Sequence, residues 1–332
     1  MILFTADLHV DEKIIAEGLL PKFAEWLNEM RRLYKVSALV VLGDIWHKHL
    51  DTKRVVSFGI LDAAVNFLNS LEFDSIIMLK GNHDESFIGL HNLTVFSLDK
   101  RVKVIDTPTS IAFPYKSNSG NPEVLNTYFI PFCKEKSYFD SIINQAPESS
   151  VICMHQTVRN FMLNSKKMAE DGVVINKPFP LVLSGDLHDF QSRDNIVYVG
   201  SPYQTRRGEN PQKQTIMFSE GKFFPIEVPG KISQRFIYVE NLDEVDQYDL
   251  KGKTIVITGD NVDVTKLDEL RNRGINIVSS SSMIEKADST ATDIDLTTFS
   301  VDIIRNIINV NTNKYFNLVG DDILQMLNKE DI

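Results

Sequence analysis

Runs of consecutive apolar residues alternate with amphipathic stretches over the first ninety residues of the chain. Three short apolar runs, at 2–5, 38–42 and 75–79, lack the polar–apolar alternation of a strand that is exposed on one face. Between these runs, apolar residues recur every three or four positions, which predicts helices over about 13–33 and 52–71. Continuous apolar strands separated by helices predict a parallel sheet that is buried on both of its faces.

The pattern changes after about residue 100, where short apolar segments are separated by polar turns. We predict strands at 102–105, 111–113, 128–130, 151–154, 181–184, 196–199 and 215–218, and a helix near 134–144. We assign these strands to a second, mixed sheet that packs on the first one. The expected fold class is therefore α/β, in the form of a layered sandwich.

The dipeptide Pro229-Gly230 marks a domain boundary, and we predict four parts of the chain. Residues 1–230 are expected to form the sandwich, and 231–283 a small α+β domain. Residues 284–298 are polar and predict a flexible linker. Residues 299–332 contain two short apolar helices, which could dock into a partner's groove or pack back onto the small domain.

Composition and charge are those of an ordinary soluble globular protein. Hydrophobic residues make up 43% of the 332 residues and charged residues 24%, and no apolar run reaches the length of a membrane span. The N-terminus lacks a signal-peptide pattern, and both cysteines, Cys133 and Cys153, fall in apolar runs, so we expect a cytoplasmic protein with reduced thiols. The net charge of −10 weakens a nucleic-acid hypothesis without excluding it, because local basic clusters or bound cations can hold phosphates.

Aspartate, asparagine and histidine residues cluster where the predicted strands end. In chain order the clusters are Asp7 with His9, Asp44 with His47, Asn82 with His83, the single His155, and Asp186 with His188. Because open α/β sheets place their sites at the carboxyl ends of the strands, we expect these side chains to converge on one rim. Each cluster alone also occurs in surface turns. The prediction depends on five clusters in order, each behind an apolar strand.

The residue types in these clusters suit divalent metal ions. Carboxylate, amide and imidazole ligands favour manganese, iron or zinc, and the lack of thiolates in the clusters argues against a soft-metal site. Two ions about 4 Å apart can grip a phosphoryl group and activate a water molecule, and they need a bridging carboxylate. The sequence therefore predicts a two-metal site that acts on phosphoesters.

In its ordered motifs the chain resembles the calcineurin-like metallophosphoesterases: D-x-H, G-D-x-x-H, G-N-H-D, a lone histidine and G-x-x-H, followed by a Gly-Ser-Pro stretch at 200–202. The resemblance covers residues 1–204 and implies an α/β/β/α sandwich. Protein Ser/Thr phosphatases of that superfamily carry G-D-x-x-D-R and G-N-H-E, whereas here the second motif ends in His47 and the third in Asp84. That combination is similar to the SbcD-type nucleases, which include the eukaryotic meiotic-recombination nuclease and its phage counterparts.

Position by position, the resemblance implies a role for each clustered residue. Asp7, His9, Asp44 and His188 would hold one metal ion, Asn82, His155 and Asp186 would hold the other, and Asp44 would bridge the two. His83 would be the catalytic histidine, and His47 would contact the scissile phosphate. The last motif departs from the family's usual G-H-x-H, because Asp186 takes the place of a histidine. We expect Asp186 to be a ligand; the alternative is that it only orients a neighbouring ligand.

The resemblance also implies a reaction and its cofactors. The expected activity is that of a 3′–5′ double-strand exonuclease and single-strand endonuclease, in DNA recombination and repair. The two divalent ions would be Mn²⁺, with Mg²⁺ as the alternative. A stand-alone phosphatase or cyclic-nucleotide phosphodiesterase of the same superfamily is the competing prediction. A third possibility is a scaffold that kept the fold and lost a metal.

The implied partners are DNA and an SMC-like ATPase subunit of the SbcC type. The nuclease subunit is expected to form a homodimer in a phage or bacterial cell, without a membrane partner. The helices at 299–332 are the candidate docking segment for the ATPase, and 231–283 would cap the site or bind DNA. The basic residues expected to contact DNA are Arg206, Arg207, Lys48, Lys53 and Arg54.

Overall fold

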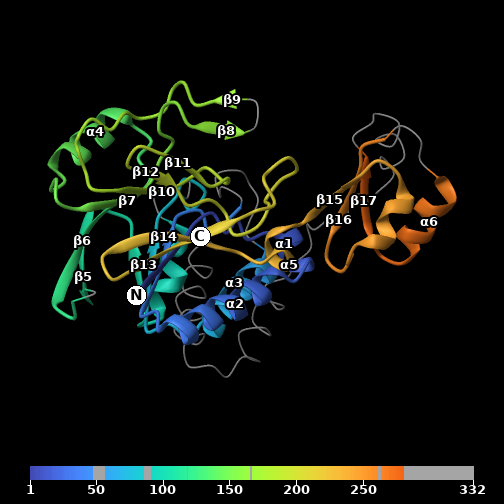
Figure 1. The fold of residues 1–332 in the computed structure, drawn as a ribbon, viewed down its shortest axis with the longest axis horizontal. Coiled ribbons are helices and arrows are strands. Elements are labelled where there is room, and N and C mark those ends of the chain that lie inside the picture. Colours follow the sequence, from blue (N-terminus) through green and yellow to red (C-terminus); the bar gives the residue numbers. More distant parts are fainter. Residues whose placement is uncertain (48–56, 86–90, 118, 165–166, 260–262, 280–332) are drawn as a thin grey trace, which may run out of the picture. The chain divides into compact units, whose positions relative to one another are not determined.

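Two six-stranded sheets form the centre of the protein in the computed structural model (Figure 1). The structure describes residues 1–47, 57–85, 91–117, 119–164, 167–259 and 263–279. Outside these ranges lie Lys48, Lys53 and Arg54, the expected linker at 284–298 and the expected helices at 299–332. None of the helices within the described ranges combines the length and the apolar character that a membrane crossing requires.

The first sheet has the strand order β14-β13-β1-β2-β3-β4. Its strands are β1 (Ile2–Thr5), β2 (Ala38–Leu42), β3 (Ser75–Leu79), β4 (Val102–Ile105), β13 (Gln214–Ser219) and β14 (Lys222–Glu227). β1 to β4 run parallel, as the apolar runs predicted, and β13 pairs antiparallel with β1. The assignment of 102–105 and 215–218 to the second sheet is wrong. β13 is buried over most of its length, and the place beside β1 covers both of its faces.

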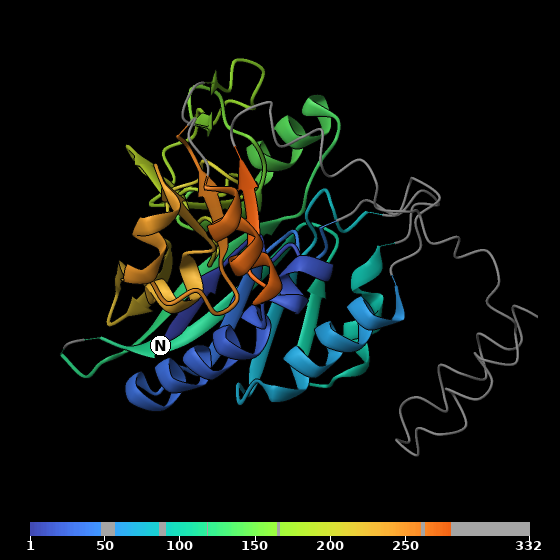
Figure 2. The same cartoon turned by 90° about the vertical axis from the view of Figure 1, so that its right-hand side faces the viewer.

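Three helices, blue in Figures 1 and 2, cover one face of the first sheet. They are α1 (Glu12–Ala16), α2 (Leu19–Tyr34) and α3 (Phe58–Ser70). Their apolar residues share one buried cluster with every second residue of the sheet, such as Leu39 and Val41 of β2. The sequence predicted one continuous helix over 13–33, but the structure ends α1 before Gly18, whose φ of 63° is left-handed and interrupts the helix.

The second sheet has the strand order β11-β12-β10-β7-β6-β5. Its strands are β5 (Thr109–Lys116), β6 (Pro122–Ile130), β7 (Val151–His155), β10 (Val182–Gly185), β11 (Gln191–Arg193) and β12 (Ile196–Tyr198). The helix α4 (Lys136–Gln145), predicted near 134–144, packs Phe139 and Ile143 into a buried cluster on one face of this sheet. A 3₁₀ helix, η1 (Asn92–Leu98), precedes β4, and the short hairpin β8 (Met162–Asn164) and β9 (Lys167–Met168) follows β7.

The alternate residues of both sheets meet in a third apolar cluster. Phe4 and Val40 of the first sheet share it with Phe129, Cys153 and Leu183 of the second. The sheets therefore pack face to face, with helices on the two outer faces. The expected α/β/β/α sandwich is confirmed.

A separate three-stranded parallel sheet, β15-β16-β17, follows the sandwich along the chain. Its elements are α5 (Gly230–Ser233), β15 (Phe236–Val239), η2 (Leu242–Gln247), β16 (Thr254–Ile257), α6 (Val264–Asn272) and β17 (Asn276–Ser279). It has an apolar cluster of its own, which includes Val245, Ile255 and Leu270. The limits of the four predicted parts of the chain stay a prediction.

Candidate metal centre

Five strands carry the clustered polar residues at their carboxyl ends. In the first sheet, β1, β2 and β3 lead to Asp7, Asp44 and Asn82, and in the second, His155 ends β7 and Asp186 follows β10. Hydrogen bonds connect the ends of the two sheets directly. The backbone N–H of Asp186 donates to Asp7 Oδ1 at 3.0 Å, and His155 Nδ1 lies 2.7 Å from the carbonyl oxygen that ends β2. Segments far apart in the sequence therefore meet at one place.

Strained backbone concentrates at these strand ends. Eight non-glycine residues of the described ranges have a positive φ, and four of them belong to the clusters: Asp7 at 53°, His9 at 43°, Asp44 at 51° and Asp186 at 88°. Left-handed backbone costs a residue with a Cβ about 1 kcal/mol or more and persists only where the surroundings hold it. The fold therefore gives up local stability to aim these four side chains.

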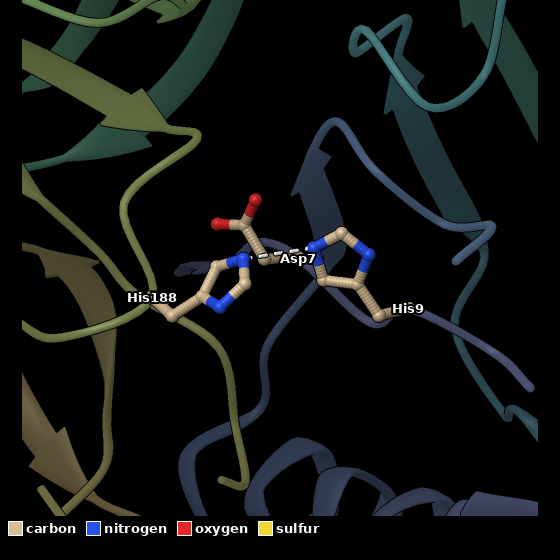
Figure 3. Close-up of side chains that lie close together, drawn as sticks. All are labelled: Asp7, His9 and His188. Carbon is tan, nitrogen blue, oxygen red and sulfur yellow. Dashed lines mark hydrogen bonds between the residues drawn. The ribbon is translucent and has the colours of Figure 1, made fainter. Parts of the chain in front are cut away.

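The first group of ligand-type atoms comprises Asp7, His9 and His188 (Figure 3). Their nearest ligand atoms all lie within 4.8 Å of one another. The Nε2 atoms of the two histidines are 2.9 Å apart, and His9 Nε2 is 3.7 Å from Asp44 Oδ2. Imidazole and carboxylate atoms so close together match the spacing of ligands around one ion.

The second group surrounds His155. Its Nε2 atom lies 2.9 Å from Asn82 Oδ1, 3.3 Å from Asp44 Oδ1 and 4.0 Å from Asp186 Oδ1. Asp44 thus presents Oδ2 to the first group and Oδ1 to the second. A carboxylate that bridges two ions needs this placement.

The hydrogen-bonding pattern tests whether these residues fit divalent cations. Nδ1 of His155 donates to a backbone oxygen, so Nε2 of the neutral ring carries a lone pair. That lone pair faces oxygen acceptors, which is unfavourable unless a second proton or a metal ion lies between them. Asp7 Oδ2 is buried without a hydrogen-bond partner among the described residues. Buried acceptors that converge without donors are costly. A cation between them removes that cost, so the residues fit a pair of divalent ions.

Burial and neighbouring charges move the pKa values of the central groups in different directions. Burial raises the pKa of Asp7 to about 7, and burial together with His188 lowers the pKa of His9 well below its usual range. Burial works against the charge on His155, but the carboxylate of Asp44 outweighs it and holds the pKa of His155 well above the usual value. The pKa of Asp44 is lowered in turn, because His155 outweighs the effect of burial. A divalent ion would take the place of the second proton on His155.

Two glycines of the motifs give the ligands their room. A Cβ on Gly43 would lie 2.2 Å from His155 Nδ1, and its φ of 87° also disfavours any side chain. A Cβ on Gly81 would lie 2.2 Å from Asp44 Oδ1. Each glycine therefore allows a ligand of another strand to pass close to the backbone.

The structure places the two remaining motif histidines beside the first group. The ring of His47 is 5.4 Å from that of His9, and the ring of His83 is 4.8 Å from it. His83 Nδ1 lies 2.6 Å from the carbonyl oxygen of His47, and His83 Nε2 is 3.9 Å from Asp44 Oδ2. The side chain of His83 is 23% exposed, whereas that of Asp44 is 3% exposed. A substrate can therefore contact His83 more easily than the buried ligand.

Asp186 lies farther from the groups than the other expected ligands. Its Oδ2 accepts a short hydrogen bond from the hydroxyl of Thr157, and its Oδ1 is 4.0 Å from His155 Nε2. Among the described residues, three sets of ligand atoms lie within 4.8 Å of one another, and Asp186 belongs to none of them: Asp7, His9 and His188; His9, Asp44 and His83; and Asp7, Asp44 and His155. Both the ligand role and the orienting role therefore stay open for Asp186.

Of the basic residues expected at DNA, only Arg206 and Arg207 are described. Both are exposed, and Arg206 Nε is 3.7 Å from Oε1 of Glu209, which in turn lies 2.8 Å from His188 Nδ1. Arg206 therefore sits one side chain away from the first group.

Sequence reasoning did not assign roles to Asp84 and Glu209. Asp84 is fully buried, and its carboxylate accepts from the backbone N–H groups of Asp44, Ile45, Trp46 and Gly81. It thus ties the second motif loop to the third. Its place at the end of G-N-H-D could have indicated a role, whereas Glu209 lies outside every motif and offered no signal.

The family model described as "Calcineurin-like phosphoesterase" matches residues 1–190. A comparison with curated protein sequences finds no match.

Three solved structures show a low similarity to the chain. GAP50, the anchor in the inner membrane complex of Plasmodium, has 11% identity and a TM-score of 0.47, over 85% of this chain and 97% of its own. The calcineurin-like phosphoesterase YfkN from Bacillus subtilis has 12% identity and a TM-score of 0.37, over 68% and 87%. The Pseudomonas putida nuclease MPE has 11% identity and a TM-score of 0.29, over 68% and 87%. With scores below 0.5, these similarities carry no information about activity.

Proposed function

The chain belongs to the calcineurin-like phosphoesterase family, and we propose that within it the protein is a two-metal DNA nuclease of the SbcD type. The family membership and the candidate ligand groups support a metal-dependent hydrolase of phosphoesters. The position of His47 carries the step from phosphoesterase to nuclease. In this motif the protein phosphatases have an Asp-Arg pair, whereas here an imidazole stands 5.4 Å from the ring of His9.

The residues divide into two ligand sets around Asp44. Asp7, His9, Asp44 and His188 would hold one ion, and Asn82, His155 and Asp186 would share Asp44 in holding the other. When bound, the pair of ions would supply a water-derived nucleophile and neutralise charge on the phosphate. Neutral His9 keeps its lone pair for this task, because burial holds the pKa of its ring low.

His83 and His47 would act on the substrate itself. Because His83 Nδ1 donates to the carbonyl oxygen of His47, a proton held on Nε2 can be given to the leaving 3′ oxygen. His47 would contact the scissile phosphate. Its ring stacks near that of His83, at 6.2 Å and an angle of 26°, so both rings face the same space.

The substrate and the partners are part of the same proposal. The protein would act as a 3′–5′ double-strand exonuclease and single-strand endonuclease, with Mn²⁺ and with an SMC-like ATPase subunit, as a homodimer. Arg206 and Arg207 are exposed, and Arg206 lies beside Glu209, which contacts His188 of the first ligand group. Both arginines would contact the phosphate backbone without reading sequence.

A digestion experiment tests the proposal. Labelled duplex and single-stranded DNA, and a chromogenic phosphomonoester, would be incubated with the full chain and Mn²⁺ or Mg²⁺. We expect metal-dependent cleavage of both DNAs, no cleavage after chelation, and none by the Asp44→Asn variant at an equal concentration of folded protein. Cleavage of the monoester without cleavage of DNA would favour the stand-alone phosphatase instead.

A further inference from the structure

A buried ion pair behind the first ligand group has no role in the reaction proposed above. Lys213 is 1% exposed, and its ammonium group donates to Glu209 Oε2 at 3.0 Å, Asp189 Oδ1 at 2.9 Å and the backbone oxygen of His188 at 2.9 Å. Burying such a pair costs several kcal/mol in desolvation and seldom adds stability over an apolar pair. Its position directly behind His188 indicates a purpose other than stability.

Glu209 connects this lysine to the ring of His188. Its Oε1 lies 2.8 Å from His188 Nδ1 and 2.6 Å from Thr205 Oγ1, and its Oε2 accepts from the backbone N–H of Thr205 at 2.8 Å. The ammonium group of Lys213 and both the backbone N–H and the hydroxyl of Thr205 donate to Glu209, so its carboxylate serves as an acceptor on both oxygens. The hydroxyl of Thr205 also lies 2.6 Å from His188 Nδ1, but it donates to Glu209 Oε1. Because a carboxylate only accepts, the ring nitrogen donates to Glu209. The lone pair of His188 is then on Nε2, which is the atom that faces His9 at 2.9 Å.

The loop that carries Glu209 is held in place from its other side. Gln204 Nε2 donates to the backbone oxygen of Glu209 at 2.7 Å, and Gln204 Oε1 accepts from the backbone N–H groups of Arg235 and Phe236 at 3.0 and 3.1 Å. The guanidinium of Arg235 is buried and pairs with Glu17 at 2.5 and 2.9 Å. Because these anchors restrain the loop, Glu209 presents its carboxylate to His188 in one orientation.

We propose that Glu209 is a positioning residue that fixes the tautomer and the orientation of the metal ligand His188. The inference rests on the proposed two-metal function. Carboxylates that accept from the second nitrogen of a ligand histidine hold its ring and raise its basicity, and their loss costs about 10- to 100-fold in metal affinity. The bond from Lys213 holds the carboxylate of Glu209 in place, which explains why the chain buries a charge pair there.

The test uses the full chain and the variants Glu209→Gln and Glu209→Asp, with Glu148→Gln as the matched control. Glu148 is exposed on the surface. Titration calorimetry with Mn²⁺ measures the affinity of each ion, and NMR of ¹⁵N-histidine-labelled, metal-free protein reports the protonated nitrogen of each ring. In Glu209→Gln we expect one of the two ions to bind about 10- to 100-fold more weakly, with the other unchanged. We also expect one histidine to lose its Nδ1-protonated signature, and Glu148→Gln to match the unaltered chain.

Glu209→Asp keeps a negative charge beside Lys213, so it supports the fold if Glu209→Gln does not. Its side chain is one methylene shorter and cannot reach both partners, so the same ion should again bind more weakly. Unaltered affinities and tautomers in either folded variant, with only a lower melting temperature, would make Glu209 a purely structural residue and overturn the proposal. If the unaltered chain itself bound no Mn²⁺, the two-metal function would fail instead.

Discussion

The two sheets of the sandwich both deliver side chains to the candidate centre, but they hold them by different means. On the first sheet, the carboxylate of Asp84 ties two motif loops together through four backbone N–H groups. At the end of β10 in the second sheet, side chains also hold side chains: Glu209 accepts from His188, and Asp186 accepts from Thr157. Backbone bonds fix the shape of a loop, whereas side-chain bonds fix the angle of a ring or carboxylate. Substitutions in the first arrangement should lower the free energy of unfolding, whereas substitutions in the second should mainly lower the affinity for the metal ions.

The largest expected effect is that of Asp84→Ala on the free energy of unfolding. The substitution leaves four buried N–H groups without an acceptor, at about 1–3 kcal/mol each, so the loss should be roughly 4 kcal/mol or more. Urea unfolding of the metal-free chain, followed by circular dichroism, measures it. Asp140→Ala, at an exposed position of α4, is the control and should change stability by less than about 0.5 kcal/mol. A comparable loss in both variants would contradict the prediction that the hydrogen bonds of Asp84 stabilise the fold.

His83→Ala should affect catalysis and leave both the fold and the metals unchanged. His83 is attached to the first sheet's loops through its backbone N–H, which donates to Asp44 Oδ1 at 2.9 Å and survives the substitution. Loss of a general acid typically lowers turnover about 10²- to 10⁴-fold. DNA cleavage rates and Mn²⁺ titration test the two halves of this expectation. His91→Ala, a histidine paired with Asp106, is the control. Loss of both ions in His83→Ala would mean that its role was misassigned.

The sequence predicted the polar clusters of the centre because each cluster is local. Asp7 and His9, or Asp186 and His188, stand within three residues of each other behind an apolar strand, and the strand pattern alone says that such ends lie on one rim. The break at Gly18 was also encoded, since Gly18 with Pro21 is a typical start of a helix. The apolar pattern over 13–33 hid this break, because the three- and four-residue spacing of apolar residues continues across it.

What the sequence could not predict depends on tertiary placement. The apolar run at 215–218 would suit either sheet, and only its pairing with β1 shows which one it joins. Glu209 lies 21 residues beyond His188 in a loop without periodicity, so no local pattern connects the two. The hydrogen-bond partner of a ligand histidine depends on which side chains the fold brings close and on their charge, and a local sequence pattern does not give this proximity.

Asp186→Asn tests whether Asp186 contributes to one of the two ions at all. If Asp186 binds the ion held by Asn82 and His155, the weaker amide ligand should lower the affinity for that ion by about tenfold. Mn²⁺ titration would show this as a change in one of two sites. Thr157→Val removes the hydroxyl bonded to Asp186 and should produce a smaller shift in the same direction. Equal affinity in Asp186→Asn and the unaltered chain would show that Asp186 neither binds that ion nor orients one of its ligands.

The smallest expected effect is that of Arg206→Ala on DNA binding. Arg206 is 72% exposed and its one ion pair among the described contacts is loose, at 3.7 Å from Glu209, so its removal should leave the fold and the metals unchanged. One lost phosphate contact should weaken DNA affinity only a few-fold, uniformly across sequences, and reduce the slope of log affinity against log salt by about one. Fluorescence anisotropy with labelled duplex over a series of salt concentrations measures both. Arg32→Ala on α2, where the guanidinium pairs with Glu72, is the control and should leave the slope unchanged. An unchanged slope in Arg206→Ala would mean that DNA does not contact Arg206. Its neighbour Glu209 would then belong to a region that serves the metal ions and not the DNA.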